Sequence, residues 1–125
     1  MSRLTLTRLF LLVVVGLTLL TSSVISAESL PRLVDVGADK CIPCIKMAPI
    51  LENLKGDFAG RMDVKFVDVW KNRDEASNYG VQMIPTQIFY AADGQELYRH
   101  TGFYGREDIL NKWQKLGYDF KEKPR

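Results

Sequence analysis

The chain has 125 residues, of which 17 are Lys or Arg and 15 are Asp or Glu, giving a formal net charge of +2. This length suits one domain, and 46% hydrophobic with 10% aromatic residues excludes intrinsic disorder as the main state. Both surplus charges lie on Arg3 and Arg8, so residues 28–125 are formally neutral, which argues against nucleic-acid binding. The two cysteines are too few for a disulfide-stabilised miniprotein.

Residues 1–27 have the layout of a secretory signal peptide. Arg3 and Arg8 precede an apolar run over residues 9–20, and small polar residues lead to Ala27. We expect cleavage after Ala27 and a folded domain over residues 28–125. The alternative is an uncleaved anchor over residues 9–27, close to the roughly 20 residues of a membrane-spanning helix. Either alternative predicts a periplasmic or otherwise extracytoplasmic protein.

A strand, a helix and a second strand are predicted first. Residues 33–36 form a short apolar run that indicates a buried strand. From Cys44, apolar side chains recur with helical spacing at Met47, Ile50, Leu51, Leu54 and Phe58. Pro49 interrupts this helix and is expected to kink it. Residues 64–69 are rich in β-branched and aromatic residues and indicate a second strand.

The second half adds a short helix, a hairpin and a last helix. Residues 74–79 predict the short helix, which Gly80 ends. Residues 86–90 and 96–101 predict two strands, and Asp93-Gly94 between them favours a hairpin. Residues 106–116 predict a helix that buries Ile109, Leu110, Trp113 and Leu116. The order βαβ-α-ββ-α predicts an α/β fold with a mixed four-stranded sheet and helices on both faces.

Cys41 and Cys44 carry the chemistry that the sequence predicts. They are three residues apart where a strand gives way to a helix. The free N–H groups and dipole of a helix N-terminus favour the thiolate, and Lys40 adds a cation beside Cys41. One cysteine can then attack a disulfide, and the second can resolve the mixed disulfide.

Three other interpretations of the cysteine pair remain. A zinc site needs about four ligands, and besides the two cysteines the sequence has only one histidine, His100. A structural disulfide would close a loop too short to constrain much of the unfolded chain. A copper-carrying thiol pair, assisted by Met47 or Met83, is a further alternative outside the cytoplasm.

The residues around both cysteines resemble the active-site region of thioredoxin. The resemblance rests on Asp35 six residues before Cys41, Pro49 five residues after Cys44, and Ile84-Pro85-Thr86 beginning 43 residues after Cys41. It extends from residue 33 to the final helix. The resemblance implies a minimal thioredoxin fold, which lacks the family's first strand and helix because only about five residues separate Ala27 from the first strand.

The resemblance also implies a role for each matching residue. Cys41 would be the exposed nucleophile and Cys44 the buried resolving thiol, with Asp35 relaying the proton of Cys44. The alternative for Asp35 is a strand-edge acid that faces water. Ile84 and a cis Pro85 would bind an extended substrate. The remaining implied residues are Gly102, which leaves room for that substrate or is a simple turn glycine, Pro43, which rigidifies the pair, and Pro49.

Four positions depart from the family pattern. Lys40 and Gly37 replace two usual tryptophans, and Ile42 replaces the usual glycine between the cysteines. The lysine that usually pairs with the buried acid falls on Phe66, so we expect Asp35 to lack a partner and to have a raised pKa. Ile42 offers no side-chain hydrogen bond to a thiolate, which favours a reducing pair, whereas Lys40 acts in the opposite direction.

We therefore expect a monomeric thiol–disulfide oxidoreductase that reduces or exchanges disulfides of protein substrates, with a thiol oxidase or isomerase as the alternative. The sequence contains no nicotinamide or flavin motif, so we expect no cofactor, and electrons would come from the thiols of another protein. The resemblance points to a membrane electron donor of the kind that serves cytochrome c maturation or the rescue of oxidised proteins.

Overall fold

The computed structural model describes residues 29–120. The predicted signal peptide or anchor in residues 1–27 and the tail after Phe120 lie outside the described residues. Between them, four strands and three helices alternate in the order βαβ-α-ββ-α. Their bounds are β1 Arg32–Gly37, α2 Ile42–Asp57, β2 Asp63–Asp68, α3 Arg73–Asn78, β3 Thr86–Tyr90, β4 Glu96–Thr101 and α4 Arg106–Lys115. No helix within residues 29–120 has the length and apolar character needed to cross a membrane.

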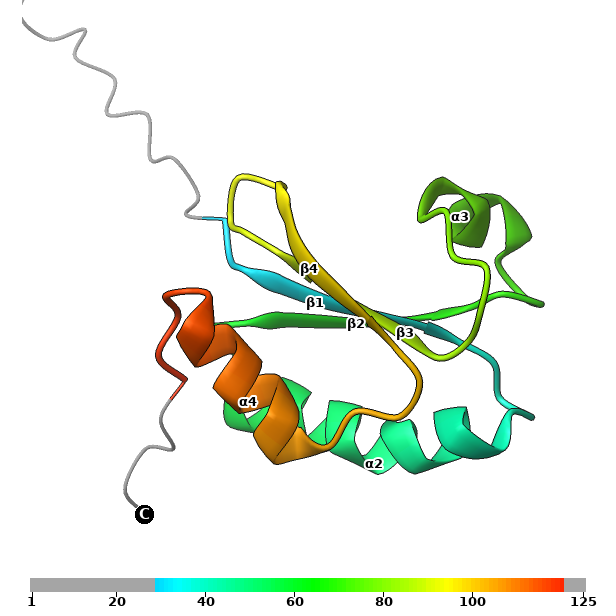
Figure 1. Ribbon diagram of the computed structural model, residues 1–125, viewed down its shortest axis with the longest axis horizontal. Helices are drawn as coiled ribbons and strands as arrows, with labels where there is room; N and C mark the ends of the chain where they lie inside the picture. Colours follow the sequence, from blue (N-terminus) through cyan, green and yellow to red (C-terminus); the bar gives the residue numbers. More distant parts are fainter. Residues whose placement is uncertain (1–28, 121–125) are drawn as a thin grey trace, which may run out of the picture.

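The strands form one mixed sheet in the order β2-β1-β3-β4. β1 pairs in parallel with β2 and antiparallel with β3, and β3 pairs antiparallel with β4. Helices α2 and α4 cover one face of the sheet and α3 lies on the other (Figure 1). The predicted mixed four-stranded α/β fold is therefore confirmed.

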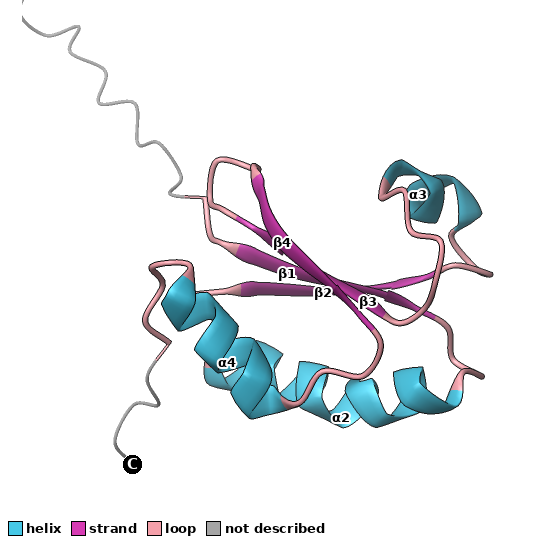
Figure 2. Cartoon of the chain, viewed as in Figure 1, coloured by secondary structure: helices cyan, strands magenta, loops and turns pink. Residues whose placement is uncertain are grey.

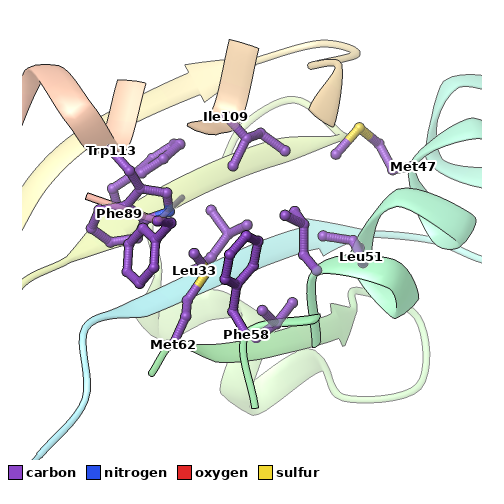
Figure 3. Packing of buried hydrophobic residues seen from close by; sticks show 11 residues of the cluster. Leu33, Met47, Leu51, Phe58, Met62, Phe89, Ile109 and Trp113 are labelled. Atoms are coloured by element: carbon purple, nitrogen blue, oxygen red, sulfur yellow. The ribbon is translucent and has the colours of Figure 1, made fainter. Parts of the chain in front are cut away.

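A large apolar core joins the sheet to α2 and α4. Leu33 of β1 and Phe89 of β3 belong to the same buried cluster as Met47 of α2 and Trp113 of α4 (Figure 3). A smaller cluster on the opposite face joins the β-branched side chains of the sheet to Ala76 of α3. Side chains of a strand alternate between the faces, so Asp35, between Val34 and Val36 of the smaller cluster, points to the α2 side.

One end of the sheet gathers the loops that matter for function. The loop from β1 to α2, the loop that enters β3 and the loop from β4 to α4 all lie there (Figure 2). Helix α2 begins at Ile42, two residues before the predicted start, because a proline is accepted in the first turn, where its missing N–H needs no partner. The helix continues through Pro49.

Candidate active site

Cys41 and Cys44 lie at the N-terminus of α2 and form a disulfide, with their Cα atoms 5.1 Å apart. Cys41 is the N-cap residue, with extended backbone, and its Sγ accepts a hydrogen bond of 3.4 Å from the backbone N–H of Cys44. Cys41 is partly exposed, whereas Cys44 is only 3% exposed. A substrate can approach the first sulfur from solvent, and this favours Cys41 as the attacking residue.

The surroundings of Cys41 offer few side-chain donors. The N–H of Cys44 is the one hydrogen-bond donor to Sγ of Cys41 among the described residues. Ile42 is apolar and 72% exposed, and Lys40 is an exposed residue. A reduced Cys41 thiolate would therefore be stabilised mainly by the backbone N–H groups and dipole of α2.

The loop before β3 lies at the same edge of the sheet. Val36 pairs with Thr86, so Pro85 lies beside the end of β1, from which the chain leads to Cys41. The Ile84–Pro85 peptide bond is cis, and the carbonyl of Pro85 accepts a 2.7 Å hydrogen bond from the N–H of Gly102. Gly102 has a φ of 103°, a backbone conformation that residues with a side chain rarely adopt. The glycine at position 102 therefore meets a requirement of the local backbone, and its role in leaving room for a substrate stays a prediction.

Exposed apolar side chains flank these site residues. Ile42 follows Cys41, Met83 precedes the Ile84–Pro85 bond and Phe103 follows Gly102; the last two are 68% and 48% exposed. Exposed apolar side chains that gather in one patch are typical of a surface that binds another molecule. The loops at this end of the sheet thus combine a disulfide with an apolar surface.

Asp35 is fully buried on the α2 side of the sheet. Burial raises its pKa to about 6, and a hydrogen bond from Gln87 acts in the opposite direction. The donor is Nε2 of Gln87, 2.7 Å from Oδ1 of Asp35. The expectation that Asp35 lacks a partner is therefore wrong, because β3 supplies an amide where the family pattern has a lysine on β2. The alternative of a water-facing strand-edge acid is also wrong.

The position of the Phe66 ring accounts for the glycine at position 37. A Cβ atom on residue 37 would lie 3.1 Å from Cε2 of Phe66 and 3.3 Å from Sγ of Cys44. The Phe66 ring therefore occupies space that a side chain at position 37 would need. It also lines a pocket of about 330 Å³ beside Cys44, together with Ala38, Ile45 and Leu51.

Asp68, at the end of β2, was missed by the sequence analysis. Its Oδ1 accepts hydrogen bonds from the N–H groups of Trp70 and Lys71, at 2.8 and 3.0 Å, and its Oδ2 accepts one of 3.1 Å from the N–H of Asp39. Lys71 also forms a 2.8 Å ion pair with Asp39. These contacts fix the loop that carries Lys40 to the end of β2. The available signal in the sequence was an acidic residue near the end of a strand, followed by a polar loop.

No group of three or more His, Cys, Asp or Glu side chains that could hold a metal ion gathers within residues 29–120. His100 of β4 instead stacks on Tyr104, with ring centroids 4.0 Å apart. Neither His100 nor any described Asp or Glu joins the two cysteines in such a group.

Comparisons with known proteins agree with this geometry. The family model described as Thioredoxin matches residues 20–115, which is more than half of the chain. Thioredoxins of Staphylococcus epidermidis and Staphylococcus aureus are 40% identical over 82 residues, covering 66% of this chain and 78% of theirs. A solved structure titled "Structure of a malarial protein" has a TM-score of 0.63 at 22% identity, covers 69% of this chain and 96% of its own, and shares the fold.

Proposed function

Because this chain belongs to the thioredoxin family and is a thiol–disulfide oxidoreductase, we propose that it works outside the cytoplasm, where it reduces or exchanges disulfides of protein substrates. The observation that carries this proposal is the disulfide at the N-terminus of α2, with one sulfur partly exposed and the other buried. In this proposal Cys41 attacks the substrate disulfide and Cys44 resolves the mixed disulfide that results.

The apolar surface supports a protein substrate. Ile42, Met83 and Phe103 offer apolar area beside the site. The pairing of Val36 with Thr86 places the backbone of Ile84 and Pro85 next to the end of β1. An extended peptide segment with apolar side chains is the chemistry that such a surface accepts. Cysteine-containing peptides that differ only in an apolar residue beside the cysteine would test this preference through their reaction rates.

The reducing direction is supported by the environment of Cys41. A pair becomes strongly oxidising when its thiolate form is stabilised by additional contacts. Ile42 provides no such contact, and Lys40, which could, is solvent-exposed, where an ionic interaction is screened. An assay in which this protein, in its reduced form, is the sole reductant of a protein disulfide such as those of insulin tests this direction.

The proposed location and electron supply rest on the sequence. Residues 1–27 have the pattern of a signal peptide or anchor, and an extracytoplasmic reductant needs a source of electrons. We assign that role to a membrane protein with a reactive thiol pair, of the kind that serves cytochrome c maturation or the repair of oxidised proteins. Sequencing the N-terminus of the exported protein should give Glu28 as its first residue if the signal is cleaved.

A copper-binding module is the rival that the same cysteines allow. Thiol titration of the reduced protein, with and without Cu(I), separates the two functions. Reaction with a protein disulfide at an unchanged rate in the presence of a copper chelator supports the oxidoreductase. Stoichiometric copper binding without disulfide exchange would support the metal carrier. Size-exclusion chromatography under the same conditions tests the proposed monomer.

A further inference from the structure

Gln87 places a buried amide against the buried acid. The register of β1 and β3 pairs Asp35 directly with Gln87, and both residues are fully buried. Nε2 of Gln87 donates a 2.7 Å hydrogen bond to Oδ1 of Asp35 across 52 residues of sequence. A glutamine in the middle of a buried strand must satisfy its polar atoms there or lower the stability of the protein.

Only one oxygen of the Asp35 carboxyl group is held in this way. Oδ2 of Asp35 and Oε1 of Gln87 are both buried and have no hydrogen-bond partner. Buried polar atoms of this kind are rare in folded proteins and call for an explanation such as a catalytic role. The amide thus fixes one carboxyl oxygen and leaves the other open to receive a proton.

The other residues around Asp35 offer few groups that could exchange a proton with it. On β2 the paired residue is the uncharged Phe66, and on β1 the same face continues with Leu33 and Gly37. On β4, His100 pairs with Gln87 and lies one strand beyond it. Gly37 lies two residues along β1 from Asp35, on the same face. A Cβ atom placed on residue 37 would lie 3.3 Å from Sγ of Cys44 in α2. Cys44 is therefore the titratable group that α2 brings over this part of β1.

We propose that Gln87 is a positioning residue that orients the Asp35 carboxylate and sets its affinity for the proton of Cys44. This inference rests on the proposed function, in which Cys44 resolves the mixed disulfide. In that step Cys44 transfers its thiol proton to the free oxygen of Asp35, and its sulfur forms a bond with Sγ of Cys41. The bond between Cys41 and the substrate sulfur breaks, and the substrate leaves as a thiolate that takes a proton from water.

Gln87→Met removes the amide donor while keeping an unbranched side chain of similar length. The ionised Asp35 then loses a buried hydrogen bond, so its pKa, followed by NMR of the carboxyl carbon in the oxidised protein, should rise by about one unit. The pH at which substrate release reaches half its maximal rate should rise by the same amount. An Asp35 titration that stays at the wild-type pH, or that moves down, would overturn the proposal.

Three controls separate positioning from a general loss of stability. Ile88→Ala lies on the opposite face of the same strand and should leave the Asp35 titration unchanged. In an Asp35→Asn background, Gln87→Met should no longer move the pH profile of release, because the group it acts on is absent. His100→Leu should leave the Gln87→Met shift intact, which excludes the imidazole as its source.

A second variant keeps the test decisive if Gln87→Met does not fold. Gln87→Glu preserves the size and polarity of the side chain and places a second acid against Asp35. The two carboxyls should share one proton and lose it at a pH above that of Asp35 in the wild type, whereas independent titration of both at ordinary pH would overturn the proposal. The NMR titration uses the oxidised protein and needs no activity, so an unshifted Asp35 refutes the role of Gln87, whereas a wild type inactive toward protein disulfides refutes the proposed function.

Discussion

The ring of Phe66 lies over Gly37, so that a Cβ atom on residue 37 would come within 3.1 Å of Cε2 of that ring. The departures from the family pattern at Gly37 and Phe66 are therefore one structural change, in which the ring of Phe66 on β2 fills the space of a side chain at position 37 on β1. The same change leaves Asp35 without a neighbouring cation on β2 and leaves Gln87 as its hydrogen-bond partner.

The first prediction concerns this pair. Gly37→Ala should lower the free energy of unfolding by about 1 kcal/mol, because the added methyl group crowds Phe66 and Cys44. The loss should shrink in a Phe66→Ala background, since the ring is then absent. Urea denaturation of the single and double variants measures the coupling. Equal losses in both backgrounds would show that the ring does not set the space at position 37.

Gly56→Ala is the matched control for this cycle. Gly56 lies in α2, and a Cβ atom there would meet nothing within 4 Å. This substitution should stabilise the protein by about 0.5–1 kcal/mol, because alanine favours the helix over glycine.

The second prediction concerns the unequal roles of the cysteines. Cys44→Ser should trap substrate on Cys41 as a stable mixed disulfide, because no thiol remains to resolve it. Cys41→Ser should trap none, because Cys44 is buried. Non-reducing gels followed by mass spectrometry detect the trapped species. Equal trapping by both variants would show that the attacking and resolving roles are wrongly assigned.

The third prediction concerns pH and stability. Burial raises the pKa of Asp35 from its ordinary value of 3.8 to about 6, so between these values the folded state holds more protons than the unfolded state. The free energy of unfolding should therefore fall as pH rises through this range, and the loss persists above it. Asp35→Asn should remove this pH dependence. Relative to the wild type, the free energy of unfolding of the variant should therefore rise by up to about 3 kcal/mol between pH 4 and pH 8.

Urea denaturation of both oxidised proteins across this pH range checks the sign. Asp93→Asn, in the exposed hairpin turn, controls for the loss of one negative charge. A wild type that gains stability relative to Asp35→Asn as pH rises would show that burial does not disfavour the charged carboxylate.

The sequence predicted the elements well but not the contacts between them. The bounds of β3 and β4 matched the prediction because the two strands flank an Asp-Gly turn. The partner of Asp35 was missed because it depends on the register of β1 against β3, which joins residues 52 positions apart. The available signal was Gln87 itself, a long polar residue directly before the apolar Ile88 and Phe89 on a buried strand.

The fourth prediction concerns Lys40. Its side chain is exposed, so its charge should change the stability of the reduced form by less than about 1 kcal/mol. For a two-electron couple this is under about 20–25 mV, and Lys40→Trp should shift the reduction potential by no more than that. A shift several times larger would favour the oxidase alternative.

The reduction potential of the wild-type Cys41–Cys44 pair, measured at equilibrium against a glutathione series, tests the central claim most directly. We predict a potential more negative than the roughly −180 mV of protein disulfide isomerase, because few side-chain contacts stabilise the Cys41 thiolate. A potential near the roughly −120 mV of the strong periplasmic oxidase would contradict the reductase function and identify the protein as a thiol oxidase.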